Sequence, residues 1–288
     1  MIKKLIRKSV SALLISLLCC SLAWAKDYRY QEPKKVVVQE TPPPIALFTP
    51  NLQQPGALIA FGENILSEGV LKLSFFADAF EGPGTHFIDL EPSIVYGITN
   101  RLSIELSVPI AASYQAANQN SSGLEDMSVQ LEYAYYQNST TAYTEEATVV
   151  GNVGVPTGSA NKLPPTGTGA MSYFVGATYN RTYVNWFLFL SPGVNFYDSY
   201  HNIEYGNKYL YQGGFGWNLF EIGTRWIIAA VSEFDGQYTA KSKVSGITNP
   251  NSGGNIILFT PSISAGATHL SLQAGIGIPI VQNLYGQQ

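Results

Sequence analysis

Two stretches of this chain of 288 residues repeat the same hairpin pattern. Residues 92–110 read PSIVYGITNRLSIELSVPI, and residues 261–280 read PSISAGATHLSLQAGIGIPI. In the second copy the even positions from Leu270 to Ile280 are all apolar, whereas the odd positions from His269 to Gly277 are small or polar. Successive side chains of a strand point to opposite faces, so each arm has one apolar and one polar face. The pattern predicts antiparallel strands that separate an apolar environment from a polar one.

Residues 1–25 have the pattern of a secretion signal. Four basic residues in positions 3–8 precede an apolar stretch over residues 10–22, and residues 23–25 form an A-x-A cleavage pattern. We expect this signal peptide to be removed after Sec-type export, and a retained N-terminal anchor is the alternative. Cys19 and Cys20 are the only cysteines, so the mature chain has neither disulfides nor thiolate metal sites.

Charge and composition narrow the class of protein. Without the signal, 12 basic residues stand against 20 acidic ones, a net charge of about −8, which argues against nucleic acid as a partner. Charged residues make up 12% of the chain, about half the usual share in soluble domains, yet no apolar run after the signal is long enough for a membrane helix. We therefore predict an all-β, antiparallel up-and-down transmembrane β-barrel with its outer face in lipid. The alternative is a soluble β-sandwich whose aromatic residues bind sugar.

The mature chain divides into a linker and one domain. Six prolines over residues 26–55 predict an extended periplasmic tail, and residues 56–288 form the expected barrel. The predicted strands are 68–79, 86–98, 101–115, 124–137, 142–156, 169–180, 184–199, 206–218, 221–239, 254–267 and 269–281. Tight turns alternate with longer polar loops near residues 80–85, 115–123, 157–168, 200–205 and 240–253. Short periplasmic turns and long extracellular loops are the rule for bacterial outer-membrane barrels.

The number of predicted strands is odd. Eleven segments leave residues 269–281 running outward, whereas a bacterial barrel with an even strand number ends on a strand that runs back to the periplasm. Either residues 57–63 supply a twelfth strand, in which case the short turns and the long loops change sides of the membrane, or the closing C-terminal strand is missing. We favour the missing strand, because the chain reaches Gln288 without a closing segment that ends in an aromatic residue.

Strand alternation also predicts which charged side chains line the barrel. On each strand the charged residues share the face opposite the large apolar ones, where they avoid lipid. The candidate lumen-lining residues are Lys72, Asp78, Asp89, Glu91, Glu105, Glu132, Glu221, Arg225 and Glu233. This mainly acidic set either solvates a packed interior or lines a pathway that favours cations and neutral polar solutes.

Aromatic residues gather beside the tight turns. Tyr and Trp suit the level of the lipid headgroups, so they predict a periplasmic-side girdle in contact with outer-membrane lipid. Its candidates are Tyr96, Tyr133, Tyr135, Tyr136, Tyr179, Tyr183, Trp186 and Trp217. We also expect folding to require the barrel-assembly machinery. Pro109, Pro156 and Pro279 cannot donate to a sheet ladder, so we expect bulges or strand ends there.

Catalytic and metal-binding patterns are weak. His86, His201 and His269 lack metal-ligand spacing, so we expect no metal site and no cofactor. Ser199 and His201 lie two residues apart, which is weak support for a nucleophile and base without a third orienting group. We expect no enzyme, and a barrel lipid hydrolase is the least favoured alternative.

Three motifs in order suggest a family. The chain contains GLEDMSVQLEYAYY over residues 123–136 and VVGNVGVPTGS over residues 149–159, besides the first hairpin. These segments resemble the outer-membrane transporter-like family of the MetA pathway of phenol degradation, over roughly residues 68–283. The resemblance implies an outer-membrane barrel of Gram-negative bacteria that passes small, hydrophobic or aromatic molecules, with no catalytic residues. A structural or adhesive surface barrel with a closed lumen is the alternative.

Overall fold

The computed structural model describes residues 13–24, 56–62, 64–82, 84–116, 118–223 and 226–286, the first of these by its backbone alone. In this part of the chain the regular structure consists of strands. The strands are β1 (Leu13–Trp24), β2 (Leu71–Gly82), β3 (Thr85–Thr99), β4 (Leu102–Ser107), β5 (Ile110–Ala116), β6 (Gln119–Leu124), β7 (Met127–Ser139), β8 (Tyr143–Val155), β9 (Ser172–Tyr183), β10 (Trp186–Tyr197), β11 (Ser199–Tyr200), β12 (Ile203–Glu204), β13 (Lys208–Ile222), β14 (Trp226–Thr239), β15 (Lys243–Val244), β16 (Ile247–Thr248), β17 (Gly254–Gly266) and β18 (Leu270–Leu284). No described helix is long and apolar enough to cross a membrane.

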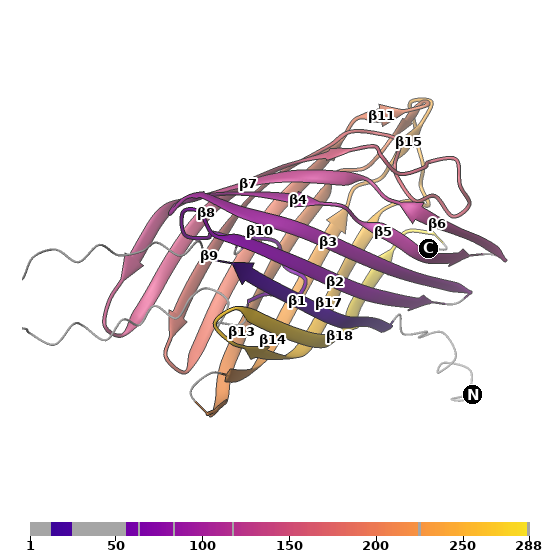
Figure 1. Cartoon of the computed structure of the whole chain (residues 1–288). Helices are drawn as coiled ribbons and strands as arrows, with labels where there is room; N and C mark the ends of the chain where they lie inside the picture. Colours follow the sequence, from indigo (N-terminus) through magenta and orange to yellow (C-terminus); the bar gives the residue numbers. More distant parts are fainter. Residues whose placement is uncertain are drawn as a thin grey trace, which may run out of the picture.

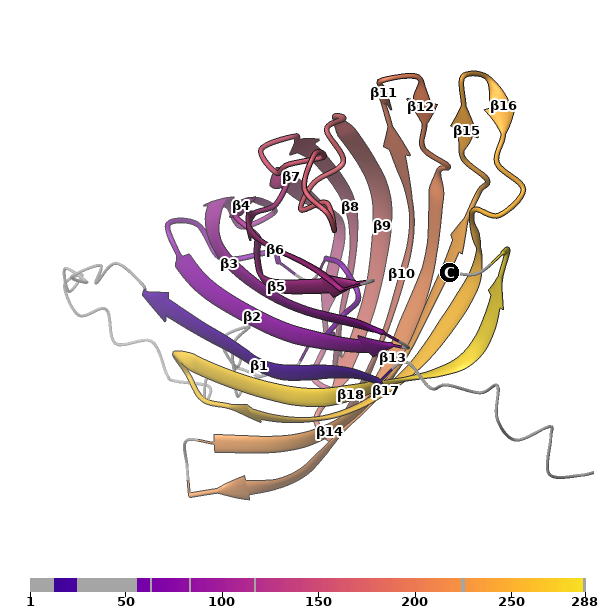
Figure 2. The ribbon, with the colours of Figure 1, turned by 90° about the vertical axis from the view of Figure 1, so that its right-hand side faces the viewer.

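The fold is an antiparallel β-barrel, as the strand alternation predicts (Figures 1 and 2). Its sheet has 14 strands in the order β2-β1-β18-β17-β14-β13-β10-β9-β8-β7-β4-β3-β5-β6, and β2 also pairs with β3. Both β4 and β5 pair with β3, so they form one broken strand, and β6 and β7 continue each other opposite them. Counting each of these two pairs once gives twelve positions around the barrel.

The twelfth position is filled from the N-terminal side. β1 pairs with β18 on one side and with β2 on the other, so it lies between the first and last strands of the predicted barrel domain. Residues 57–62 are not a strand, so the first of our two explanations for the odd number is wrong. β1 falls in the predicted signal peptide, whose removal stays a prediction. Residues 1–12 and 25–55, which hold the rest of that signal and all of the predicted tail, lie outside the described residues.

Prolines interrupt the ladder where the sequence predicts it. β4 ends at Ser107 and β5 begins at Ile110, so Pro109 breaks the predicted strand 101–115. β8 ends just before Pro156, and the register between β17 and β18 shifts beside Pro279. A missing N–H leaves each of these positions without one ladder bond, which explains why regular pairing stops or shifts there.

The long loops contain structure that the sequence pattern did not predict. Residues 119–123, expected in a loop, belong to β6, which forms a hairpin with β5. The loops near 200–205 and 240–253 pair with each other through Ile203 and Val244, and they form a separate sheet of four short strands, β11-β12-β15-β16. Figure 2 shows this small sheet projecting beyond the barrel at the end opposite the tight turns. Two-residue strands carry no readable alternation, so only their mutual pairing reveals them.

Asp126 fastens another long loop to the wall. Its carboxylate accepts hydrogen bonds from the Gly158 N–H at 3.0 Å and from the Thr168 N–H and hydroxyl at 2.7 and 2.8 Å. The Tyr205 hydroxyl donates to the Thr168 carbonyl at 2.8 Å, and burial, with the charge of Asp126, raises the pKa of Tyr205. Asp126 belongs to the segment 123–136 and Gly158 to the segment 149–159, so one carboxylate joins two of the segments that carry the family resemblance.

Burial alternates along the strands as the predicted faces require. On β7, Val129, Leu131 and Tyr133 are 42–48% exposed, whereas Gln130 and Glu132 are 9% and 1% exposed. The same contrast separates large apolar from polar or small residues on β4 and β18. On β3, Ile94 and Tyr96 are exposed and Ser93 is buried, although Val95 shares the buried face. Large apolar side chains therefore cover the outside of the barrel, and polar side chains face inward.

Candidate functional site

The interior contains a segment that the sequence analysis did not place there. Residues 56–62 and 64–69, which we call the luminal strap, touch the inner faces of β18, β14, β13, β9, β7, β4 and β3 in succession. This order follows the order of strands in the sheet. The strap therefore runs around the inner wall and narrows the lumen.

Glu233 on β14 anchors the first half of the strap. Its carboxylate accepts hydrogen bonds from the backbone N–H groups of Leu58, Ile59 and Ala60, the last two at 3.1 and 3.4 Å. The Glu233 side chain is fully buried. Three backbone donors give this buried carboxyl group the hydrogen bonds that it can no longer make with water.

Asn64 anchors the second half of the strap through both its backbone and its side chain. The backbone N–H donates to Glu132 at 3.1 Å, and the side-chain amide donates to Glu105 at 2.9 Å. The amide oxygen accepts a hydrogen bond from Lys72 Nζ at 2.7 Å. Beyond it, the Leu66 N–H donates to the Ser103 hydroxyl at 2.9 Å. The inner-face charges of four strands thus meet on one short stretch of chain.

Apolar packing also fixes the first half of the strap. Phe187, Phe189 and Val231 form a buried cluster, and Ala57 and Ala60 pack against it. Phe187 and Phe189 lie over glycines of β13, where an added Cβ would stand 2.1–2.3 Å from their rings. Part of the interior is therefore apolar, in addition to the acidic set.

The predicted lumen residues divide into three groups. Lys72, Glu105, Glu132 and Glu233 contact the strap directly. Asp78, Asp89 and Glu91 lie beyond it on β2 and β3, with Asp78 opposite Asp89 in the ladder. Glu221 is exposed near a tight turn, and Arg225 lies outside the described residues.

Solvent reaches the inner wall beyond the strap. Glu91 shares its face with buried Ser93, and it accepts a hydrogen bond from the Ser107 hydroxyl at 2.5 Å. Glu91 is nevertheless exposed. Water therefore enters the barrel to this depth on the β3 side.

The sequence analysis missed a buried acidic residue of the interior. Asp235 is 5% exposed and accepts hydrogen bonds from Thr260 and Gln212 at 2.9 and 3.3 Å. It stands two residues after Glu233 on the same strand, so strand alternation alone could have identified it.

The predicted girdle residues lie on the outer face near the tight turns. Tyr96, Tyr133, Tyr135, Tyr136 and Trp217 are 42–55% exposed. The register of β7 and β8 shifts between Ala134 and Tyr136, which leaves Tyr135 as an extra residue. This bulge turns both Tyr135 and Tyr136 outward, which regular alternation does not allow.

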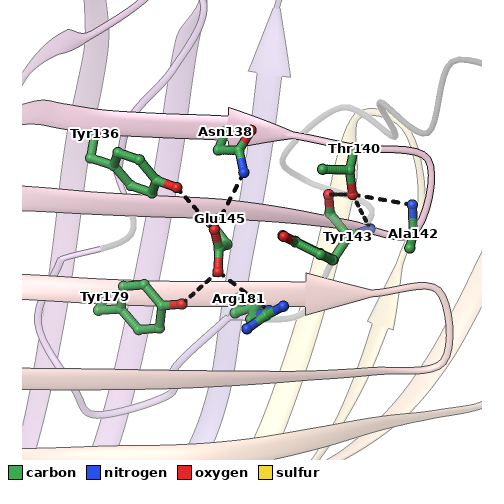
Figure 3. A network of polar contacts seen from close by, with 8 residues as sticks. All are labelled: Tyr136, Asn138, Thr140, Ala142, Tyr143, Glu145, Tyr179 and Arg181. Carbon is green, nitrogen blue, oxygen red and sulfur yellow. Dashed lines mark hydrogen bonds and ion pairs between the residues drawn. The ribbon is translucent and has the colours of Figure 1, made fainter.

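A polar network crosses this girdle (Figure 3). Glu145 on β8 accepts hydrogen bonds from the Tyr179 hydroxyl at 2.9 Å, the Tyr136 hydroxyl at 3.0 Å and the Asn138 amide at 3.4 Å. Arg181 Nε lies 3.4 Å from the same carboxylate. The ladder places Asn138 and Arg181 directly on either side of Glu145, so register alone brings the network together.

The weak catalytic pair lies at the tip of an outer loop. Ser199 belongs to β11, and the His201 ring stacks on Tyr200 with the ring centres 4.1 Å apart. In the part of the chain that the structure describes, no group of three or more His, Cys, Asp or Glu residues could hold a metal ion.

Comparisons with known proteins support the fold. No family model matches the chain. No curated protein matches it either. Among solved structures, the chain is similar to the COG4313 outer membrane channel from Pseudomonas putida F1, with a TM-score of 0.50 and 11% sequence identity. The similarity covers 93% of this chain and 96% of that protein. At this identity the likeness shows a shared barrel fold.

Proposed function

We propose that this protein is an outer-membrane channel for small molecules. The observation that carries the proposal is an acidic inner wall that water reaches at Glu91, inside a barrel with an apolar outer face. A wet, charged interior inside a lipid-facing barrel is the design of a channel. The fold shared with an outer membrane channel supports both the location and the class of function.

The charge of the inner wall favours cations over anions. The described acidic residues of the interior include Asp78, Asp89, Glu91 and Glu105, with Lys72 as the nearby cation. A negative field in a narrow passage concentrates cations and repels anions. The resemblance of the sequence to the phenol-degradation family adds small, hydrophobic or aromatic molecules as the class of solute to test.

The luminal strap favours one alternative, a surface barrel with a closed lumen. Its backbone follows the wall and is anchored on both sides, so it occupies part of the passage. In that case the small outer sheet β11-β12-β15-β16 would be the surface that carries the structural or adhesive function.

Conductance of the purified protein in planar bilayers separates the two functions. We expect discrete steps and, in a KCl gradient, a reversal potential that indicates cation selectivity. Glu91→Gln should reduce this selectivity, because it removes a water-exposed charge from the wall without touching the strap. Glu204→Gln, at an exposed outer-loop pair with Lys243, is the matched control and should change nothing. Absence of both conductance and uptake of small aromatic solutes into liposomes would favour the closed barrel.

A further inference from the structure

The girdle network holds a positive charge on the outside of the barrel. Arg181 follows Tyr179 and precedes Tyr183 at alternate positions of β9, on the face opposite buried Thr178. Glu145 occupies the same outer face of β8, two residues after Tyr143. Charged side chains on this face need a reason, because Arg or Lys costs about 2–4 kcal/mol at the bilayer midplane and about 0–1 kcal/mol near its surfaces.

Aromatic rings hold the guanidinium group in place. The Arg181 guanidinium carbon lies 4.0 Å from the centre of the Tyr143 ring and 5.2 Å from that of Tyr183. Tyr183 in turn stacks on Trp186, with ring centres 4.2 Å apart. Cation–π contact and the nearby carboxylate fix the orientation of a side chain that is otherwise flexible.

The two charged side chains of the network are not equally exposed. Glu145 accepts three hydrogen bonds and its side chain keeps 12% of its surface exposed, whereas the Arg181 side chain keeps 31%. The carboxylate is thus the enclosed member of the pair, and the cation is the member presented to the surroundings. Figure 3 shows Glu145 at the centre of the network, between its donors Tyr136, Asn138 and Tyr179, with Arg181 beside it.

The depth of the network matches the lipid headgroups. It lies at the ends of β7 and β9, next to the tight turns that follow these strands and among the aromatic residues of the girdle. Tyr and Trp gather where acyl chains give way to headgroups, and tight turns mark the periplasmic side of such barrels. With the tight turns on the periplasmic side, an oriented arginine at this depth would face the phosphate groups of the inner leaflet.

We propose that Arg181, clamped by Tyr143, Tyr183 and Glu145, is a binding site for the phosphate of a glycerophospholipid headgroup. The planar guanidinium suits a phosphate because it can donate two parallel hydrogen bonds. The aromatic rings beside it cover the glycerol and the first carbons of the chains. The inference rests on the proposed membrane location but not on transport.

Native mass spectrometry of the detergent-solubilised protein tests this site. Phosphatidylethanolamine, phosphatidylglycerol and diacylglycerol are added in turn, and the fraction of protein carrying one lipid is titrated. Both phospholipids should bind, and diacylglycerol, which lacks the phosphate, should bind far more weakly. Arg181→Gln should weaken phospholipid binding roughly tenfold, because it removes the charged donors. Arg181→Lys should keep part of the affinity, since the positive charge remains but the two parallel donors of the guanidinium are lost.

Arg101→Gln is the matched control, because it removes an exposed arginine at the same end of the barrel. Heat-dependent mobility in gels shows that each variant is folded. Equal binding by the wild type and Arg181→Gln, or equal binding of diacylglycerol, would overturn the proposal. A folded protein that binds phospholipid but conducts no ions would refute the channel and leave this site standing.

Discussion

Single side chains decide how closely the luminal strap approaches the wall. Gly97 on β3 lies where an added Cβ would stand 2.2 Å from the Ser67 carbonyl oxygen and 2.8 Å from that of Leu66. We expect Gly97→Ala to lower the free energy of unfolding by about 1–3 kcal/mol, because backbone atoms must move to accept the methyl group. Urea unfolding in detergent micelles, followed by tryptophan fluorescence, measures the change. Gly151→Ala is the control, since its Cβ would meet open space, and a loss of equal size there would contradict the explanation.

The carboxylate of Glu233 is the second decisive group. Glu233→Gln replaces an acceptor of three backbone N–H groups with an amide that presents its own donors. We expect a cost of about 1–3 kcal/mol, the usual size when buried hydrogen-bonding groups lose their partners. Hydrogen exchange at Leu58, Ile59 and Ala60 should accelerate while exchange in β7 stays slow. Unchanged protection of these three amides would show that packing alone holds the strap.

Several hydrogen bonds fasten the long loop between β8 and β9 to the wall. Asp126 accepts three of them, beside those from Lys162 to the Ser122 carbonyl and from Ser121 to the Pro164 carbonyl. We expect Asp126→Ala to speed tryptic cleavage after Lys162 at least tenfold, because the loop loses its main anchor to the wall. Asp198→Ala is the control, since that side chain accepts a single hydrogen bond, from Tyr173 at 3.2 Å. Cleavage at the wild-type rate in Asp126→Ala would assign the anchoring to the remaining loop contacts.

The whole barrel has two different ends, and their orientation can be measured. Ile247 at the tip of the small outer sheet is 75% exposed, and Leu219 beside a tight turn is 51% exposed. If long loops face the outside of the cell, a membrane-impermeant maleimide should label Ile247→Cys in intact cells and leave Leu219→Cys unlabelled. Breaking the outer membrane should expose both positions. Labelling of Leu219→Cys in intact cells would reverse the orientation and move Arg181 to the outer leaflet.

The sequence predicted local properties well. Alternation on β3, β4, β7 and β18 correctly assigned exposed and buried faces, because a strand repeats every two residues whatever lies beside it. Prolines marked the break after β4 and the end of β8 for an equally local reason, the missing N–H. The tyrosines of the girdle followed from their place beside predicted turns.

Contacts between segments far apart in the sequence could not be predicted from local patterns. Glu233 meets Leu58 across 175 positions, and Ile203 pairs with Val244 across two loops. The strap has no periodicity that marks it, and sequence reasoning assigned its first residues to a possible strand. The same limit explains why a strand between β18 and β2 was sought after residue 281, whereas β1 lies there.

The sequence by itself therefore determined that this chain forms a barrel of antiparallel strands, with apolar residues outside and acidic residues inside. The tertiary structure alone decided which acidic residues hold the strap, which remain in contact with water, and that Glu145 and Arg181 meet on the outer face. The physical reason is that the direction of a side chain depends on its own strand. Its partner depends on the register between strands and on segments far away in the sequence.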